Sequence, residues 1–285
     1  MNPEIASSYR RAEAVARVRA RNFYYGFLAL PAEKRHALCA VYAFMRHCDD
    51  ISDGSCSTAD KHNMLLTWRT HLTAALQGRF DGSPIFPAFH DTVQRFAIPA
   101  DYFHWVIDGA EMDLTIDRYR SFADLYQYCF KVASAVGLIC LQIFGYADVH
   151  ARALAEQCGI AFQLTNILRD IREDAAMGRI YIPEEDLEKF HYPAENLQRG
   201  VINENFRELM AFEAGRAGQY YTESRGLLPL IHADSRPALW AMTEIYRRLL
   251  KKIEQRHYDV FGPAIRLSRP EKVAVAVRAL AMRFL

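Results

Sequence analysis

The chain has 285 residues, of which 51% are hydrophobic and 24% are charged, so it is long enough to bury one large core. Its 35 basic and 34 acidic side chains leave a formal charge of +1, which indicates neither a nucleic-acid-binding surface nor a polybasic tail for anionic lipid. The 6 cysteines include no CxxC pair, so the sequence indicates neither a zinc site nor a disulfide framework. We therefore expect a protein of the reducing cytoplasm that binds no nucleic acid.

The N-terminal part of the chain predicts helices separated by glycine and proline loops. An alanine-rich polar pattern predicts a surface helix over residues 3–19, which ends before an aromatic cluster at residues 23–27. Pro31 is expected in the first turn of the next helix, over residues 32–52. Further helices are predicted over residues 60–76, 86–96 and 101–114.

The helix over residues 32–52 ends in an acidic motif, CDDISD. Asp49 and Asp53 stand four residues apart, so they lie on the same face of a helix. Arg46 and Tyr42 lie one and two turns earlier on nearly the same face. The motif therefore places a basic and a phenolic side chain beside two carboxylates.

The longest apolar helix is predicted over residues 122–144. Ser121 is its expected N-cap, with Asp124 three residues later in a loose capping box. Small residues at positions 133–137 permit another helix or a ligand to approach closely. No segment reaches the roughly 18 uninterrupted apolar residues that a membrane span needs.

The next helix, predicted from residue 148 past residue 170, carries a second acidic motif. Its polar stripe recurs at i, i+3, i+7 and i+11 and consists of Gln163, Asn166, Asp170 and Asp174. Apolar residues between them give the helix a face to bury. An oxygen-rich stripe of this kind suits a hard divalent cation. The alternative is the solvated face of an ordinary amphipathic helix.

The C-terminal part of the chain is also helical. After Asp174 a glycine and a proline end the helix and leave a flexible segment, with Arg179 and Tyr181, that is expected to fold over a site. Helices over residues 203–227, 235–258 and 269–284 follow. The sequence has no alternating strand pattern, internal repeat or low-complexity linker, so residues 1–285 are expected to form one all-α domain, a helix bundle.

The two acidic motifs predict a metal site if they face each other across the bundle. Their carboxylates would repel one another strongly without bound cations. Mg²⁺ is the expected cation, because it takes one or two carboxylates together with waters and the oxygens of a substrate diphosphate. A di-iron carboxylate centre is the competing chemistry, but it requires paired Glu-x-x-His motifs, and the sequence has a single late instance at Glu254 to His257.

With these motifs the sequence resembles the squalene/phytoene synthases, which join two isoprenoid diphosphates head to head. The segments that carry the resemblance extend along nearly the whole chain and read RNFYYGFLALP, YAFMRHCDDISD, YCFKVASAVGLICLQIFG, FQLTNILRDIREDAAMGRIYIP and RRLLKKIEQRHYDVF. The resemblance implies a helix bundle of the isoprenoid synthase type with a central cavity.

The resemblance also implies roles for individual residues. The metal ligands would be the two aspartate pairs and an adjacent amide, namely Asp49, Asp53, Asn166, Asp170 and Asp174. The substrate diphosphate would be bound by Arg21, Arg46, Gln163, Asn166, Tyr246 and Arg266. Tyr42 would be a further catalytic residue beside the first pair. The chain departs from the family pattern at residues 262–264, where basic residues are usual.

The implied reaction is the condensation of two farnesyl diphosphates to presqualene diphosphate and on to squalene, a step of isoprenoid biosynthesis. The C1–oxygen bond of one substrate ionises, the C2=C3 double bond of the other attacks, and loss of a proton closes a cyclopropane. The alternatives are a phytoene synthase that condenses two geranylgeranyl diphosphates and a non-catalytic subunit of a prenyl synthase. The NFYYGFLALP segment is more similar to that of bacterial relatives that use a C15 substrate, which favours farnesyl diphosphate.

A cationic intermediate requires a dry cavity with aromatic walls. The candidates for its lining, each of which is alternatively plain core, are Phe23, Tyr24, Phe27, Phe130, Phe144 and Phe162. Lys131 stands where some relatives have tyrosine, and it is either a diphosphate ligand or an exposed charge.

The resemblance implies Mg²⁺ as the cofactor, with Mn²⁺ as a substitute, and NADPH if the reaction runs to squalene. The partners would be isoprenoid diphosphates, and the sequence leaves the oligomeric state open. Because the substrate tails and the product are apolar, we expect loose contact with the inner face of the membrane, without insertion.

Overall fold

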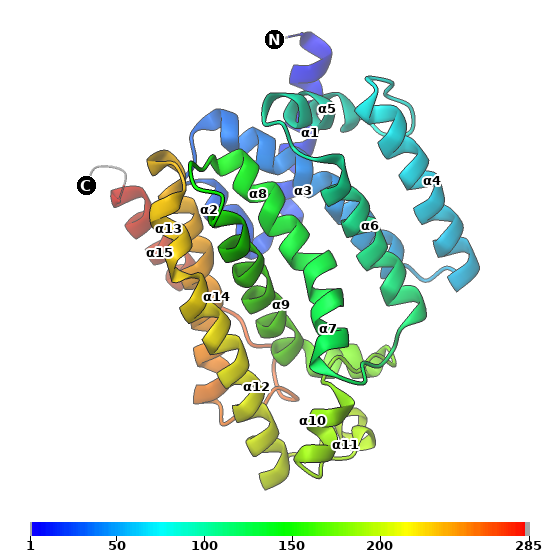
Figure 1. Ribbon diagram of the computed structural model, residues 1–285, viewed down its shortest axis with the longest axis vertical. Coiled ribbons are helices and arrows are strands. Elements are labelled where there is room, and N and C mark those ends of the chain that lie inside the picture. Colours follow the sequence, from blue (N-terminus) through cyan, green and yellow to red (C-terminus); the bar gives the residue numbers. More distant parts are fainter. Residues whose placement is uncertain (1, 283–285) are drawn as a thin grey trace.

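Helices make up most of the computed structural model, which describes residues 2–282 without the side chains of Arg21 and Asn22. They pack as an elongated bundle (Figure 1). In chain order they are α1 (Pro3–Arg19), α2 (Arg21–Phe27), α3 (Ala32–Ser52), α4 (Thr58–Leu76), α5 (Phe86–Arg95), α6 (Ala100–Thr115), α7 (Phe122–Cys129), the π-helical turn η1 (Phe130–Ser134), α8 (Ala135–Phe144), α9 (Ala151–Ala176), α10 (Glu184–Lys189), α11 (Ala194–Arg199), α12 (Glu204–Glu223), the 3₁₀ turn η2 (Ser224–Gly226), α13 (Leu227–Leu230), the 3₁₀ turn η3 (Ala233–Ser235), α14 (Arg236–Gln255) and α15 (Arg269–Ala281).

Helix α9, which carries the second acidic motif, is packed from several sides. It contacts η1, α8, α12 and α14. Apolar residues of the helix, among them Leu164, Ile167 and Ile171, are buried in these contacts. The amphipathic pattern is therefore confirmed, and the polar stripe of α9 is held rigidly by the core.

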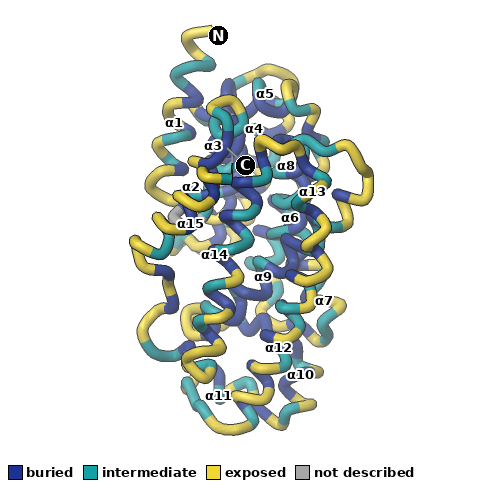
Figure 2. The backbone as a smooth tube through the Cα atoms, turned by 90° about the vertical axis from the view of Figure 1, so that its left-hand side faces the viewer, coloured by how far each residue is buried: buried dark blue, intermediate teal, exposed yellow. Residues whose placement is uncertain are grey.

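One continuous hydrophobic core extends along the bundle, so the prediction of an all-α architecture is confirmed. Figure 2 shows the buried residues along the inside of the helices and the exposed ones along the outer edges. The part of the chain between residues 2 and 282 contains no β-strand. It has only isolated bridges, between Arg118 and Ile180 and between Tyr146 and Ile231.

Local capping explains why several helices start where they do. The Ser121 hydroxyl accepts a hydrogen bond from the Asp124 amide while the Asp124 side chain accepts one from the Ser121 amide, so the predicted capping box forms. Ser268 and Glu271 make the same arrangement at the start of α15. Each cap stabilises its helix by about 1 kcal/mol.

Small residues allow α9 to pack very closely against η1 and α8, as their positions predict. A Cβ atom on Gly159 would lie 2.7 Å from the Cα atom of Ser134, and one on Gly137 would lie 2.9 Å from the backbone oxygen of Ala155. Both distances are shorter than real side chains allow, so glycine is required at this crossing.

The structure differs from the predicted elements in several places. The aromatic cluster at residues 23–27 is part of α2, in which Phe27 is buried and Phe23, Tyr24 and Tyr25 are partly buried against the core. Pro31 is the cap before α3 and not a residue of its first turn. The predicted helix over residues 122–144 contains the π-helical turn η1. The final helix ends at Ala281, and the predicted helical residues 283 and 284 lie outside the described residues.

The segment after α9 also differs from its prediction, since it is packed and contains two short helices, α10 and α11. The side chains of Ile180, Tyr181 and Ile182 are buried. Arg216 of α12 holds α10 by donating a hydrogen bond to Asp186 at 2.9 Å, and it also donates one to Glu213 of its own helix at 2.8 Å. The segment therefore forms a fixed wall of the bundle.

Among the described residues one helical stretch, Phe122–Phe144, has the length and hydropathy of a membrane span. It comprises α7, η1 and α8, and half of its most apolar window is buried inside the bundle. Because this stretch packs on α6 and α9, it is explained as a core helix.

Candidate active site

An apolar cavity of about 310 Å³ lies within the bundle. Its walls come mainly from α2, α3, α6, α8, α9 and α14, and they include Phe27, Val106, Leu141 and Leu239. On α3 the lining residues extend from Leu38 to Asp49, which at a rise of 1.5 Å per residue is about 17 Å. The predicted central cavity is therefore present, and it is elongated.

Four of the six aromatic residues predicted to line this cavity do so, namely Phe23, Phe27, Phe144 and Phe162. The other two, Tyr24 and Phe130, pack against the core, which was their alternative. The Tyr24 ring packs edge-on against Phe27, and its hydroxyl lies 3.4 Å from Glu13. Phe130 packs on Trp105 instead.

A polar pocket of about 590 Å³ brings the two acidic motifs together. Asp49 and Asp53 reach it from the end of α3, and Asp170 and Asp174 reach it from α9. The facing arrangement inferred from the sequence is therefore present.

The apolar cavity and the polar pocket are continuous. Residues that line both are Arg46, Asp49, Asp113, Tyr128, Gln163 and Asn166. An apolar chain inside the cavity would therefore place a charged end group directly among the carboxylates.

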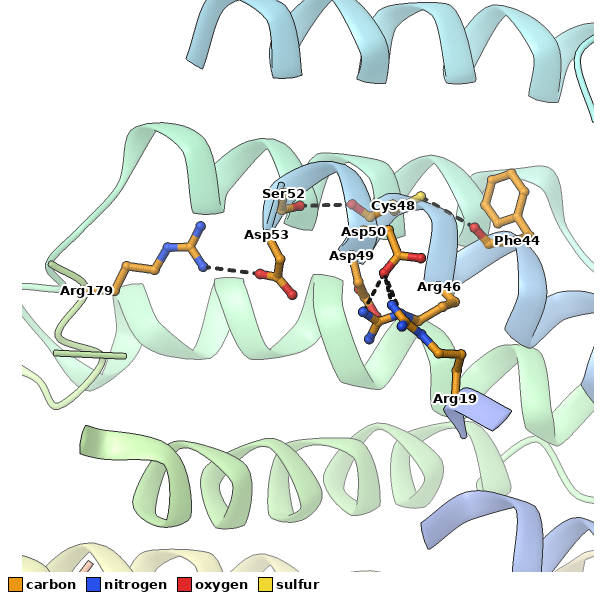
Figure 3. A network of polar contacts seen from close by, with 9 residues as sticks. All are labelled: Arg19, Phe44, Arg46, Cys48, Asp49, Asp50, Ser52, Asp53 and Arg179. Atoms are coloured by element: carbon orange, nitrogen blue, oxygen red, sulfur yellow. Dashed lines mark hydrogen bonds and ion pairs between the residues drawn. The ribbon is translucent and has the colours of Figure 1, made fainter. Parts of the chain in front are cut away.

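Asp50 holds two arginines, of which Arg46 lines the polar pocket. Its Oδ1 atom accepts hydrogen bonds from Arg46 Nε at 2.8 Å, from Arg46 Nη2 at 2.5 Å and from Arg19 Nη2 at 2.5 Å. Figure 3 shows both guanidinium groups converging on Asp50, while Asp53 points toward Arg179. The motif CDDISD thus supplies two pocket carboxylates and one that orients basic groups.

Asp113 of α6 is a pocket residue that the sequence reasoning missed. The Tyr181 hydroxyl donates a hydrogen bond to its Oδ1 atom at 2.8 Å, and the Tyr128 hydroxyl lies 3.3 Å from that of Tyr181. Asp113 follows Val106 and Ala110 at i, i+4 and i+7, and all three residues line the cavity. A carboxylate in an apolar helical stripe was the signal that would have revealed it.

Burial and mutual repulsion raise the pKa values of two pocket carboxylates, Asp49 and Asp174. Burial, followed by the neighbouring Asp170, raises the pKa of Asp174 to about 8. The pKa of Asp49 rises to about 7, mainly through burial, with Asp53 and Asp113 adding to the rise against the opposing charge of Arg46. The Asp49 side chain keeps 58% of its surface accessible because it faces the open pocket. The surrounding walls of the pocket nevertheless displace much of the solvent around its carboxylate, which is why burial raises its pKa. The pocket therefore favours the binding of cations.

Two further arginines face the acidic pocket: Arg169, which the sequence did not assign to it, and Arg179, which lies in the segment expected to fold over a site. Arg169 of α9 donates a hydrogen bond from Nε to Asp170 at 2.7 Å, and Arg179 lies 3.8 Å from Asp53. Both line the pocket. Arg169 stands directly before Asp170 in the sequence, but a helical neighbour in sequence normally points to another face, so spacing alone could not place it.

The two predicted amides, Gln163 and Asn166, lie where the cavity meets the pocket. The Asn166 Oδ1 atom is buried and has no hydrogen-bond partner among the described residues. An acceptor of this kind, beside two carboxylate pairs, fits a bound cation or ligand donor. Within residues 2–282 no three His, Cys, Asp or Glu side chains are grouped closely enough to hold a metal ion by themselves. This donor set fits Mg²⁺, which takes few protein ligands and completes its shell with water and phosphate oxygens.

The remaining predicted residues are placed unequally. Arg266 lines the polar pocket, and Arg172 holds the preceding loop by donating hydrogen bonds to the backbone oxygens of Phe261 and Gly262 at 2.9 and 3.2 Å. Tyr42 lines the apolar cavity only. Tyr246 is buried, stacks on Phe162 at 4.4 Å and is absent from the described lining of both pockets. Arg21 begins α2, but its side chain lies outside the described residues.

The sequence pattern of the Squalene/phytoene synthase family matches residues 16–271 of the chain. The chain belongs to this family. Squalene/phytoene synthases are prenyltransferases that act on isoprenoid diphosphates, and the joined cavity and acidic pocket match that chemistry.

Squalene/phytoene synthase relatives resemble the chain over nearly its full length. A phytoene synthase of Mycobacterium tuberculosis is 38% identical over 98% of this chain and 92% of its own length. A 15-cis-phytoene synthase of Synechococcus elongatus is 36% identical over 90% of this chain and 87% of its own. The crystal structure of a dehydrosqualene synthase with a bound ligand superimposes with a TM-score of 0.90 at 29% identity, over 98% of this chain and 97% of that one.

The structure also decides two alternatives left open by the sequence. Glu254 and His257 are exposed near the end of α14 and line neither pocket, so the di-iron alternative is wrong. Lys131 lies 3.4 Å from Asp108 in an ion pair and lines neither pocket. Of its two interpretations, the structure therefore supports the surface charge.

Proposed function

We propose that this squalene/phytoene synthase is a magnesium-dependent phytoene synthase, which condenses two geranylgeranyl diphosphates head to head and releases both diphosphates. The observation that carries the proposal is the apolar cavity that opens into a pocket bearing two aspartate pairs. The C20 substrate is supported by the names of relatives that are 38% and 36% identical. The C20 substrate replaces the C15 substrate, farnesyl diphosphate, that the NFYYGFLALP segment favours.

The polar pocket would hold the diphosphate groups. Bound Mg²⁺ would supply positive charge that stabilises the departing diphosphate. Asp49 and Asp53 on one wall and Asp170 and Asp174 on the other would hold the Mg²⁺. Mn²⁺ is expected to substitute, because it prefers the same oxygen ligands. The raised pKa values of Asp49 and Asp174 and the partnerless oxygen of Asn166 support a cation at this place.

Arginines at the rim would bind the diphosphate oxygens directly. Arg46 lines both the cavity and the pocket, so it would lie near the junction of a bound prenyl chain and its diphosphate. Arg169 and Arg179 face the same pocket from the other wall. Charge-assisted hydrogen bonds from these groups strengthen as negative charge develops on the leaving group, which lowers the barrier to ionisation.

The cavity would protect the allylic cation once the C1–oxygen bond has ionised. Its lining is mainly apolar, and Phe23, Phe27 and Phe162 can present aromatic faces to positive charge. The second prenyl chain attacks through its C2=C3 double bond, and the route to phytoene ends with proton loss. No reductant is consumed, so NADPH is not required in this proposal.

A C15 substrate is the second candidate. It is supported by the TM-score of 0.90 to the dehydrosqualene synthase. The two candidates share the site and differ only in the length of chain that the cavity accepts.

The test is incubation of the purified protein with labelled geranylgeranyl or farnesyl diphosphate and Mg²⁺, with and without NADPH, followed by separation of the products. The proposal expects a C40 hydrocarbon from geranylgeranyl diphosphate without NADPH. A C30 product alone would replace it by the C15 assignment. If neither substrate reacts, the alternative of a non-catalytic subunit is favoured over both.

A further inference from the structure

The outward face of helix α15 is apolar. At 100° per residue, Val275, Ala276 and Ala279 point to the bundle, and all three are buried. The opposite face consists of Pro270, Val273, Ala274, Val277 and Ala281, and each of these residues is exposed. Val273 and Val277 keep 50% and 60% of their surface accessible. An amphipathic surface helix normally has polar residues at these positions.

Basic residues border this apolar face on both sides. On the helical wheel Arg269 lies along one edge and Arg278 along the other, and both are exposed. The acidic residue of the helix, Glu271, is paired with Lys252 at 2.8 Å. An apolar face with arginines at its edges is complementary to an anionic lipid surface, in which the arginine stems lie along the acyl region and the charged ends reach the headgroups.

The helix also adjoins the candidate active site. Lys272 of its first turn and the preceding residues Ala264 to Arg266 line the polar pocket. On its inner side α15 packs on α2, from which Phe23 and Phe27 reach the apolar cavity. In Figure 1, α15 is at the left edge of the bundle, and α4 is at the opposite edge.

We propose that α15 docks the protein on an anionic phospholipid bilayer, with Val273 and Val277 inserted between the headgroups and Arg269 and Arg278 contacting lipid phosphates. Docking would bring the protein to the membrane that dissolves the prenyl substrate and the hydrocarbon product. The benefit to catalysis rests on the proposed function, but the docking itself does not.

The test is flotation of the purified full chain with phosphatidylcholine vesicles, with and without phosphatidylglycerol, in the absence of substrate. The wild-type protein is expected to float mainly with the anionic vesicles. The V273D/V277D variant is expected to lower the bound fraction about tenfold, since two inserted apolar side chains become charged. R269E/R278E is expected to abolish the preference for anionic vesicles.

The matched control is M64D/L66D, which places the same charges on exposed apolar residues of α4, where Leu66 is 45% accessible. It should bind vesicles like the wild type. Circular dichroism checks that each variant is folded, and activity with substrate in detergent micelles should match that of the wild type.

Equal vesicle binding by V273D/V277D and the wild type would overturn the proposal. So would a dimer in size-exclusion chromatography that only V273D/V277D dissociates, because a second copy would then cover the face.

Discussion

The hydroxyl of Tyr181 donates a hydrogen bond to Asp113 at 2.8 Å, across 68 residues of sequence. The bond joins the segment after α9 to the wall of α6. Tyr181 also stacks on Tyr128 at 5.0 Å and on Tyr119 at 5.9 Å. The part of the chain that the sequence suggested as a loose cover is therefore a fixed side of the pocket.

Tyr181→Phe removes one hydrogen-bond donor from the half-buried Asp113 carboxylate. Hydrogen bonds to charged groups contribute about 1.5–3 kcal/mol, so the free energy of unfolding should fall by about that amount. Urea denaturation followed by circular dichroism measures it. Tyr258→Phe, at a half-buried tyrosine outside both pockets, is the control and should change stability by much less. An unchanged midpoint for Tyr181→Phe would contradict this role of the bond.

Asp50→Ala should release Arg46 and Arg19 from their shared acceptor. Because Arg46 would still carry its charge but lose its orientation, we expect the catalytic efficiency with prenyl diphosphate to fall about tenfold, mostly through a higher KM. Steady-state kinetics at saturating Mg²⁺ separates the two parameters. Asp101→Ala, at an exposed aspartate in the first turn of α6, should leave both unchanged. A loss confined to kcat would argue against the positioning of substrate.

Gly159→Ala should destabilise the crossing of α9 and η1. The added Cβ atom would meet the backbone of Ser134 at 2.7 Å, and overpacking of this kind costs about 1–3 kcal/mol. Gly215→Ala on α12 is the matched control, because nothing lies within 4 Å of its Cβ position. That change should be neutral or stabilising, since alanine is the better helix former. Thermal unfolding compares them, and similar melting temperatures would contradict the close approach.

Glu213 should make stability depend on pH. Burial, and beyond it the neighbouring Asp186, raise the pKa of Glu213 above its ordinary value of 4.5 against the charge of Arg216. The folded state therefore holds this proton more tightly than the unfolded chain. The resulting stabilisation is fully present below pH 4.5 and is lost as the pH rises through the higher folded-state pKa.

Glu213→Gln removes that titration. The variant should gain stability relative to the wild type as the pH is raised from 4.5 toward neutral and beyond. Denaturation at a series of pH values measures the difference. Glu223→Gln, at an exposed residue of the same helix, should follow the wild type at every pH. If the stability of Glu213→Gln also followed that of the wild type at every pH, the account of a raised pKa for Glu213 would be contradicted.

Periodicity and spacing were sufficient to predict the parts of the site that lie on one helix. The motifs on α3 and α9 each repeat with the helical period, so their shared faces followed from the sequence. Neither motif alone predicts that the two faces meet. That prediction followed only from the presence of both motifs in one helix bundle. The capping box at Ser121 is local and was predicted for the same reason.

Contacts that depend on tertiary packing were not predictable in this way. Asp113 is a single carboxylate in an apolar stripe, and Arg169 reaches the pocket from a position beside the polar stripe. The π-helical turn η1 lies in the segment packed against α6 and α9 and has no pattern of its own. In the sequence Tyr24 and Phe130 look like the four aromatic residues that line the cavity. Only the tertiary packing decides that these two point elsewhere.

The central claim is that the two aspartate pairs act together on a prenyl diphosphate. The most direct measurement is the rate of C40 product formation from labelled geranylgeranyl diphosphate with Mg²⁺, for the wild type, Asp49→Asn, Asp170→Asn and the control Asp101→Asn. Several kcal/mol of charge stabilisation correspond to at least about a hundredfold in rate, so either pocket variant should fall by that factor and the control should not. Full activity in Asp49→Asn and Asp170→Asn would contradict the account.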